Sequence, residues 1–318
     1  MCVMDSQVDV VVVGELNVDL ILNRIDGFAE MGKEKMAGEM ILTLGSSSAI
    51  FASNLSSLGS KVSFLGKIGN DIFGDLVVDS LKNKGVNADL IIRSEELKTG
   101  ATIILNYDED RAMVSHAGAM EALILEDITE EILKKARHLH FSNYFMQPGM
   151  KTTIRDMFQI AKGLGLTTSF DTQWDPAEKW DLDLYSLLPF VDVFLPNKQE
   201  LLYLTKKSTV DDALEYLSPI ANTIAVKMSN EGSLVITGGE KLQKDAFLNK
   251  DVIDAIGAGD SFNAGFIHKF VQKCPIGECQ EFGNLTGAIS TTAAGGTTAF
   301  GDYDSVIEIA KDRFGYTG

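Results

Sequence analysis

Residues 252–269 read VIDAIGAGDSFNAGFIHK, and this stretch decides how the rest of the chain is interpreted. Gly257, Ala258 and Gly259 come directly before an apolar-periodic run that is typical of a helix. Small residues at a helix start leave backbone N–H groups uncovered, and these groups, with the positive end of the helix dipole, can hold an anion. Asp260 falls in the first turn of the predicted helix. The stretch therefore predicts a phosphate site with a carboxylate beside it.

Two interpretations of Asp260 follow from this position. In the first, it is a general base that takes a proton from a hydroxyl attacking phosphorus, while the amides hold the phosphate oxygens. In the second, it is an acidic residue that only caps the helix and complements its dipole, which is common. The four residues GAGD do not decide between the two by themselves.

Length, composition and charge set the class of protein. The chain has 318 residues, is 45% hydrophobic and carries a formal net charge of −17, so it can bury the core of one large α/β domain. Nucleic acids and anionic membranes attract basic surfaces, so we expect this chain to bind neither. We predict neither a signal peptide nor a membrane span at the N-terminus, whose apolar run is short. Cys2, Cys274 and Cys279 lack metal-type spacing, which indicates a reducing, cytoplasmic compartment.

The N-terminal part predicts a buried strand followed by polar side chains. Val8–Val13 is a β-branched run that ends at Gly14, which is typical of a strand buried on both faces of a parallel sheet. Beyond it, alternation places Asn17 and Asp19 on one strand face. Short polar side chains at the carboxyl end of a central strand are well placed to bind sugar hydroxyls. The alternative is a pair of turn residues that cap the loop.

Two strand-to-helix turns come next. Gly45 and Ser46 begin a small-residue loop that opens a predicted helix through Leu58, and its amides could face a ligand. The second turn places Asp71 at the N-cap of another helix, where we expect it to have a structural role.

Three short segments alternate like antiparallel strands joined by turns: Leu90–Arg93, Thr102–Asn106 and Arg111–Ser115. Because they interrupt the strand–helix repeats, we expect a small sheet that stands off the main domain. Arg111 could there contact an anionic group of a substrate, but we favour a solvated arginine paired with the acidic turn at 107–110.

Strand–helix repeats resume after Glu126. The predicted strand at 138–141 places His138 and His140 on one face, and without a third ligand at useful spacing we interpret them as packed side chains. The next predicted strand, Thr167–Phe170, ends at Asp171, where sites gather in open α/β sheets.

The remaining motifs combine helix starts with charged residues. Asn197 and Glu200 have the spacing of a capping box. The predicted strand Thr223–Met228 reaches Lys227, and a lysine that ends a buried strand needs an anion, for which an ATP phosphate is suitable.

These motifs resemble the ribokinase-like sugar kinases, the PfkB family. IGAGDSFNAGF is very similar to the C-terminal signature of that family, usually written D-T-x-G-A-G-D-x-F, whose last Asp is the catalytic base. The resemblance implies this role for Asp260 and an anion hole at Gly257, Ala258 and Gly259. Asp254 is implied as a ligand of a monovalent cation, although Ala255 stands where the family usually has Thr.

The N-terminal motifs of the family are matched in part. G-x-x-N-x-D implies that Asn17 and Asp19 hold the sugar. The family motif G-G-x-x-x-N is present at Gly45, with Ser46 for the second glycine and Ile50 for the asparagine. The resemblance still implies that Gly45 and Ser46 contact the substrate. Because the asparagine is absent, it does not imply that the sugar is the one that ribokinase uses.

Further motifs imply a nucleotide site. In the family, the Glu of N-x-x-E orders the Mg²⁺–phosphate environment, which implies an indirect metal role for Glu200. The family form V-K-x-G-x-x-G contacts the nucleotide and is matched with Ser229 in place of the first glycine, and a helix over 281–294 resembles one that borders the adenine. The implied nucleotide-binding residues are Asn197, Lys227, Ser229, Gly232 and Asn284.

The resemblance runs from about Val8 to Asp302 and implies a three-layer α/β/α doubly wound sheet with a small β-sheet lid. The lid strands are expected within about 15–44 and 90–116, and a C-terminal helix or tail over 303–318. In this family the lid often doubles as a dimer interface, which makes a homodimer a candidate assembly.

The implied function is an ATP-dependent sugar kinase that phosphorylates a primary hydroxyl of a free sugar or sugar acid. ATP and Mg²⁺ are the implied cofactors, with K⁺ as a further candidate. One alternative is a nucleoside kinase of the same fold. Another is a sugar- and nucleotide-binding protein without turnover, motivated by Ser46, Ile50, Ser229 and Ala255.

Overall fold

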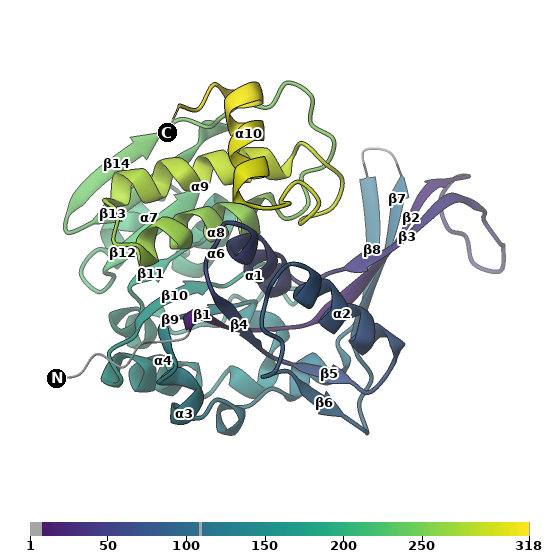
Figure 1. Ribbon diagram of the computed structural model, residues 1–318, viewed down its shortest axis with the longest axis horizontal. Helices are drawn as coiled ribbons and strands as arrows, with labels where there is room; N and C mark the ends of the chain where they lie inside the picture. Colours follow the sequence, from purple (N-terminus) through teal and green to yellow (C-terminus); the bar gives the residue numbers. More distant parts are fainter. Residues whose placement is uncertain (1–7, 108–109, 318) are drawn as a thin grey trace.

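A computed structural model describes residues 8–107 and 110–317. An eight-stranded central sheet runs through the body of the molecule in the order β14-β13-β12-β11-β10-β9-β1-β4 (Figure 1). The pairings from β4 across to β12 are parallel, whereas β13 and β14 add an antiparallel edge. The strands are Val8–Val13 (β1), Val62–Leu65 (β4), Ala136–Ser142 (β9), Thr167–Asp171 (β10), Val193–Phe194 (β11), Thr223–Lys227 (β12), Ser233–Thr237 (β13) and Glu240–Lys244 (β14).

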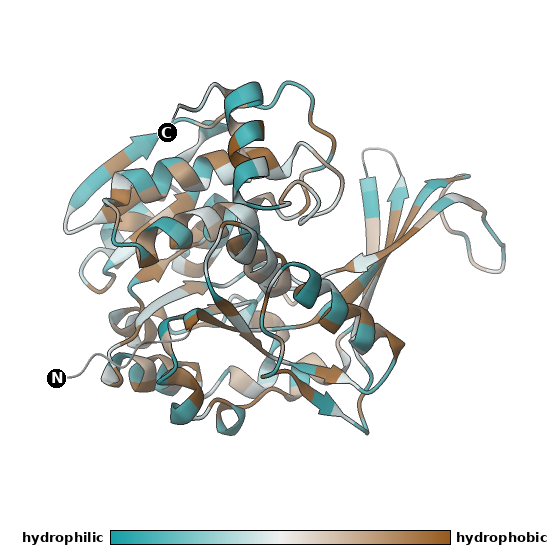
Figure 2. Ribbon diagram, viewed as in Figure 1, coloured by the Kyte–Doolittle hydropathy of each residue, from teal (hydrophilic) through white to brown (hydrophobic). Residues whose placement is uncertain are grey.

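Helices cover both faces of this sheet, which makes three layers with an apolar core on each side. One layer contains Ser47–Ser57 (α1), Ile72–Asn83 (α2), Ala258–Val271 (α8), Ile276–Ser290 (α9) and Tyr303–Phe314 (α10). The other contains Glu130–Leu133 (α3), Ile154–Gly163 (α4), Leu184–Leu187 (α5), Lys198–Thr205 (α6) and Val210–Leu217 (α7). Strand residues toward the middle of the sheet are hydrophobic, whereas the edge strand β14 is largely hydrophilic (Figure 2).

A separate four-stranded sheet projects from the body, as expected for a lid (Figure 1). Its order is β3-β2-β7-β8, with strands Ala37–Leu44, Asn17–Ile25, Gly100–Tyr107 and Asp110–His116. The expectation that Leu90–Arg93 contributes a lid strand was wrong. Ile92–Ser94 (β6) instead pairs in parallel with Lys67–Gly69 (β5) in a two-stranded sheet of its own.

The register of the lid gives its two faces different chemistry. Asn17 and Asp19 lie on one face, where Asp19 pairs with Thr102, and Thr102 pairs with Ser115. On the opposite face, one row of apolar residues crosses all four strands: Leu42, Leu20, Ile103 and Val114. The polar face is the one that carries the expected sugar-binding residues.

Several local predictions are confirmed. Asp71 is the N-cap of α2, and Asn197 with Glu200 forms a capping box at the start of α6. The expected helix over 281–294 is α9, which begins earlier and ends at Ser290. Cys274 and Cys279 are free thiols, and Cys2 lies outside the described residues. Across 8–107 and 110–317, no helix is both long and apolar enough to cross a membrane.

Candidate active site

The N-terminus of α8 carries the residues that are predicted to bind an anion. Gly257 is the N-cap and has φ of 73°, a left-handed conformation that favours glycine. A Cβ atom at Gly257 would lie only 2.7 Å from the Cα of Gly296, so a side chain has no room there. The first turn of an α-helix has N–H groups without intrahelical partners, which Gly257, Ala258, Gly259 and Asp260 provide here. The Ala258 N–H also donates to Ala255 O, outside the helix, at 3.3 Å.

Asp260 is 8% exposed and belongs to a connected polar network. Its Oδ1 accepts a hydrogen bond from Nε2 of Gln173 at 2.8 Å, and the same nitrogen lies 3.0 Å from Oδ2 of Asp171. Asp171 Oδ2 also accepts from Nζ of Lys227 at 2.7 Å and from Nδ2 of Asn263. The anion that Lys227 was expected to need is therefore supplied within the chain by Asp171.

The charges of this network change how its acids titrate. Burial raises the pKa of Asp260 to about 8, with a further contribution from the Asp171 carboxylate and an opposing one from Lys227. Burial also raises the pKa of Glu200 to about 7. A carboxyl group whose pKa lies near neutral pH is suited to proton transfer.

Glu200 and Asn197 lie beside Lys227, because the two segments are bridged. Lys227 N donates to Pro196 O at 3.0 Å, and Asn197 pairs with Lys227 as an isolated bridge. The capping box is complete: Asn197 N donates to Glu200 Oε2 at 2.8 Å, and Glu200 N donates to Asn197 Oδ1 at 2.9 Å. Both readings of this motif, cap and site residue, fit the position.

The expected sugar residues come together at the base of the lid. Asn17 Nδ2 donates to Asp19 Oδ1 at 3.0 Å and to Thr102 Oγ1 at 3.2 Å. Gly45 packs against the side chains of Asn17 and Asp19, because a Cβ atom at Gly45 would lie 2.4 Å from Asp19 Oδ1. Burial raises the pKa of Asp19 to about 6, and the Glu15 charge adds to this rise.

The side chain of Ser46 makes its hydrogen bonds within the chain. Its Oγ donates to Glu15 O at 2.6 Å and accepts from Ala49 N at 3.0 Å, so the side chain caps α1. Its φ of 71° is left-handed, the backbone conformation that a glycine would adopt easily. The serine therefore keeps the loop geometry while its hydroxyl is used within the chain.

The sequence interpretation missed Glu15 as a site residue. This glutamate is buried, and its Oε1 accepts from Ser47 Oγ at 2.7 Å and from Ser48 N at 3.2 Å, while Oε2 accepts from Ser48 Oγ. Its charge contributes to the raised pKa of Asp260. The available signal was an acidic residue directly after a buried strand, facing a serine-rich loop.

Three of the predicted nucleotide residues, Ser229, Gly232 and Asn284, form a separate group close to residues 244–246. Asn284 Nδ2 donates to Lys244 O at 3.3 Å and to Asp245 O at 3.1 Å. Gly232, with φ of 87°, approaches so closely that a Cβ would lie 2.0 Å from Lys244 O. Ser229 lies in the turn before Gly232, also with a left-handed φ.

Three apolar side chains are exposed in the segment that leads to α8. Leu248, Val252 and Ile253 are each about 60% exposed in the segment that leads to α8. Asp254 follows them, and its two carboxylate oxygens accept from Ile256 N and Gly295 N, both at 2.9 Å.

Side chains from α1 and α2 hold the segment that packs on Gly257. Asn54 Nδ2 donates to Gly296 O and to Ser261 Oγ, both at 2.9 Å. Lys84 Nζ donates to Thr297 O at 2.9 Å and to Phe300 O at 2.5 Å. Residues 296–300 are thus fixed by donors from two helices.

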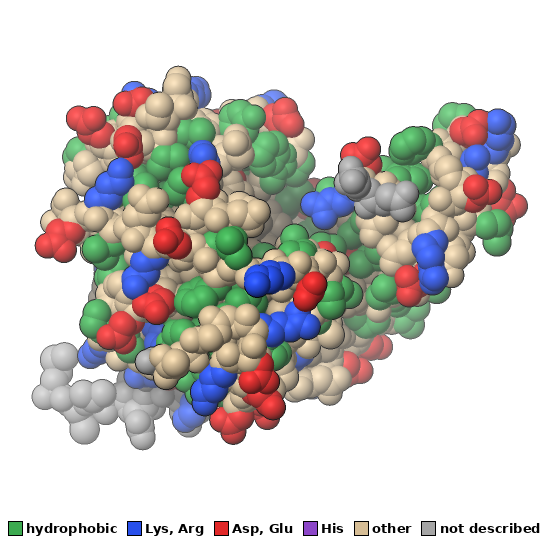
Figure 3. Space-filling view, turned by 90° about the horizontal axis from the view of Figure 1, so that it is seen from above, with side chains coloured by type: hydrophobic (Ala, Val, Ile, Leu, Met, Phe, Trp, Pro, Cys, Tyr) green, Lys and Arg blue, Asp and Glu red, His purple; other side chains and the backbone are tan. Residues whose placement is uncertain are grey.

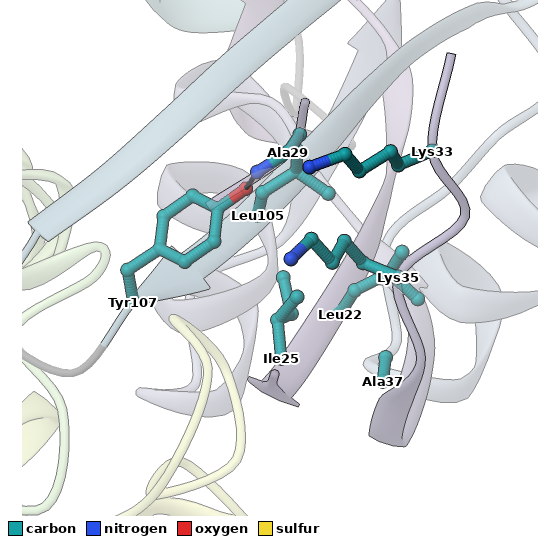
Figure 4. A pocket seen from close by; sticks show the side chains of 8 residues that line it. All are labelled: Leu22, Ile25, Ala29, Lys33, Lys35, Ala37, Leu105 and Tyr107. Carbon is teal, nitrogen blue, oxygen red and sulfur yellow. Dashed lines mark hydrogen bonds between the residues drawn. The ribbon is translucent and has the colours of Figure 1, made fainter. Parts of the chain in front are cut away.

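Metal-type clusters and a pocket in the lid are two further places where a ligand could bind. The described part of the chain contains no cluster of three or more His, Cys, Asp or Glu that could hold a metal by itself. Carboxylate oxygens are nevertheless suitable Mg²⁺ ligands alongside substrate phosphates. The ammonium of Lys227 pairs with Asp171 at 2.7 Å, and the charges of Asp171, Glu200 and Asp260 all raise its pKa. A pocket of about 170 Å³ lies at the far end of the lid, lined by Leu22, Ile25, Leu105, Tyr107 and neighbours (Figure 4), away from the Asn17–Asp19 end of β2.

Comparison with other proteins assigns the family. Residues 7–301 match the model of the pfkB family carbohydrate kinases. An uncharacterized sugar kinase of Archaeoglobus fulgidus is 27% identical over 74% of this chain and 92% of its own. Probable fructokinase-4 of Arabidopsis thaliana is 26% identical over 84% of this chain and 87% of its own. An ATP-dependent ribose-1-phosphate kinase of Halopiger xanaduensis is 28% identical over 95% and 97%.

Solved structures share the fold. Arabidopsis thaliana ribokinase, solved with ribose and ATP, superposes with a TM-score of 0.85 at 23% identity, covering 96% of this chain and 99% of that one. Adenosine kinase from Sinorhizobium meliloti superposes with a TM-score of 0.83 at 26% identity, covering 95% and 99%. With a family match that spans nearly all of the folded chain, the protein belongs to the PfkB family of carbohydrate kinases, which are phosphotransferases with an alcohol group as acceptor.

Proposed function

We propose that this kinase transfers the γ-phosphate of ATP to a primary hydroxyl of a free, uncharged sugar, with Asp260 as the general base. The observation that supports this most is the buried Asp260 carboxyl at the N-terminus of α8, where anion-binding amides and a proton acceptor share one place. Phosphoryl transfer depends mainly on positioning and charge stabilisation, which these two features provide.

Each group in the proposed mechanism has one task. Asp260 takes the proton of the attacking hydroxyl, and Gln173 orients its carboxyl group through the 2.8 Å hydrogen bond. The amides of Gly257, Ala258, Gly259 and Asp260 hold the phosphate oxygens as charge develops. Asn17 and Asp19 bind sugar hydroxyls.

Nucleotide and metal are assigned from the surrounding groups. The proposed ATP site is bordered by Asn197, Lys227, Ser229, Gly232 and Asn284. A bound Mg²⁺ would neutralise phosphate charge. The Glu200 carboxylate, at the start of α6, would help to order the surroundings of the metal and the phosphates. Asp254, the candidate K⁺ ligand, accepts one backbone N–H on each carboxylate oxygen, and each oxygen keeps a further lone pair that a cation could use.

The charges near the proposed sugar site favour an uncharged acceptor. Asp19 and Glu15 are both acidic, and the Glu15 charge raises the pKa of Asp19. A phosphate or carboxylate on the acceptor would be repelled by these groups. We therefore place neutral sugars ahead of sugar acids and phosphorylated sugars. A nucleoside is the second candidate, because the S. meliloti adenosine kinase is similar in both sequence and fold.

The test is ADP release from Mg-ATP with fructose, ribose, 2-dehydro-3-deoxygluconate, ribose 1-phosphate and adenosine as acceptors. Turnover on a neutral sugar, reduced about 10²–10⁴-fold in Asp260→Asn, would support the proposal. A preference for ribose 1-phosphate or the sugar acid would refute the uncharged acceptor, and adenosine as best acceptor would favour the second candidate. Full activity of Asp260→Asn would exclude its role as base.

We also propose that two copies pair through the apolar face of the lid. Leu42, Ile103 and Val114 on that face are 40%, 43% and 70% exposed. Figure 3 shows hydrophobic side chains on the surface of the projecting lid. A second copy of the same face would cover this row.

A further inference from the structure

Helix α2 is attached at both ends, and its two ends reach different parts of the site. At its N-terminus, Asp71 Oδ2 accepts from Thr99 N at 2.9 Å, and Oδ1 accepts from Thr99 Oγ1 at 2.7 Å. Thr99 directly precedes β7, the lid strand that pairs with the sugar-binding strand β2. The start of α2 is thereby fastened to the base of the lid.

The other end of α2 is fastened to the segment beside the anion hole. Lys84 is the C-cap residue, and its ammonium donates to Thr297 O and Phe300 O. An ammonium has three donors and no acceptor, so two carbonyls satisfy most of its hydrogen-bonding capacity. Lys84 is half-buried, and no carboxylate lies within ion-pair distance of it among residues 8–107 and 110–317.

The 297–300 carbonyls are close to the catalytic backbone. Gly296 packs directly on Gly257, the N-cap of α8, and leaves no room for a Cβ atom between them. A shift of residues 296–300 therefore displaces the first amide of the anion hole. The contacts thus begin with the hydrogen bonds between Thr99 and Asp71 at one end of α2. They continue from Lys84 at its other end to residues 297–300, beside the place where Gly296 packs on Gly257.

We propose that α2 couples the position of the lid to the anion hole, with Lys84 and Thr99 as positioning residues at its two ends. The helix has twelve residues, about 18 Å at the usual rise, and helices transmit displacement because their backbone hydrogen bonds resist compression. When the lid moves onto a sugar, the base of β7 shifts α2, and Lys84 carries that shift to residues 296–300.

The kinetic test compares Lys84→Met, Thr99→Val and the double variant. Each single change is expected to lower kcat by roughly 3- to 30-fold, with KM for ATP and sugar changed less than about twofold. Distant changes normally combine multiplicatively. Thr99→Val removes the hydroxyl bonds to Asp71 Oδ1 and from Gly69 N and leaves the bond from Thr99 N to Asp71 Oδ2. The double variant is expected to match the slower single variant, because weakening either end already uncouples the helix.

Matched controls separate coupling from a general loss of stability. Lys82→Met removes an exposed ammonium from the same last turn of α2, and Thr99→Ser keeps the hydroxyl that Asp71 accepts. Both controls should retain wild-type kcat. Multiplicative losses in the double variant, or an unchanged kcat in Lys84→Met, would overturn the proposal.

A second measurement does not depend on turnover, since the kinetic test rests on the proposed kinase function. Hydrogen exchange of the Gly295 and Phe300 amides should accelerate in Thr99→Val, although Thr99 lies at the opposite end of α2. Unchanged exchange there would refute the coupling, whether or not the wild type phosphorylates a sugar. Absence of turnover with accelerated exchange would refute only the proposed function.

Discussion

At the scale of one residue, the proposed mechanism makes catalysis depend on the protonation of Asp260. Burial raises its pKa to about 8, and only the deprotonated carboxylate can accept the proton of the sugar hydroxyl. We expect kcat/KM for the acceptor to rise with pH and level off above about 8. Steady-state rates over a pH series check this, and a flat profile would contradict it.

Glu15 allows a test of why the pKa of Asp260 is raised, because the Glu15 charge contributes to that rise. Glu15→Gln removes that charge and keeps the side-chain shape. The midpoint of the pH profile should move to lower pH. A midpoint that stays in place would show that the Glu15 charge does not reach the base.

The same raised pKa makes Asp260 costly for stability. Between the unfolded pKa of 3.8 and the folded value of about 8, the folded state binds more protons, so its stability falls as pH rises. Asp260→Asn removes this dependence. Its melting temperature should exceed that of the wild type by a margin that grows from about pH 5 to pH 8. An equal margin at both pH values would contradict this assignment.

Residue roles could be predicted from the sequence where they depend on neighbours along the chain. Residues 257–260 lie within one turn, so their amides and carboxylate could be placed together. The contacts of Gln173 with Asp260 join residues 87 positions apart, and Glu15 meets Ser48 across 33 positions. Such pairs depend on the tertiary fold, and no local pattern indicates them.

At the scale of elements, the start of α8 depends on two glycines in different ways. Gly257 has a left-handed φ and no space for a Cβ, whereas a Cβ at Gly259 would lie 3.7 Å from Lys227, an ordinary contact. Gly257→Ala should therefore destabilise the protein by roughly 1–3 kcal/mol. Gly259→Ala should be neutral or stabilising by up to about 1 kcal/mol, since alanine favours helix. Urea unfolding of both variants tests this, and equal effects would argue against the strained N-cap.

Elements were predictable in proportion to their length and pattern. The continuous β-branched run Val8–Val13 and the apolar-periodic residues of α8 carry strong signals. The three-residue strand β6 carries a weak one, and its residues do not indicate whether it pairs with β5 or joins the lid. Strand partners depend on the path of the whole chain.

At the scale of the whole molecule, the lid determines assembly in our proposal. Val114 lies on its apolar face, and the adjacent Met113 lies on the opposite face. Val114→Lys should convert a dimer to a monomer, while Met113→Lys should leave the dimer intact. Light scattering after size-exclusion chromatography measures both. A monomeric wild type would refute pairing through the lid.

Charged side chains on an edge of the central sheet oppose the pairing of two copies through that edge. Strand β14 is one of the two edge strands, and its sequence Glu240-Lys241-Leu242-Gln243-Lys244 places charged side chains along it. Unpaired backbone groups of an edge strand invite another strand to add, and lysines and glutamates oppose this by keeping their charges hydrated. The hairpin β13–β14 thus protects a long hydrophobic sheet from edge-to-edge aggregation.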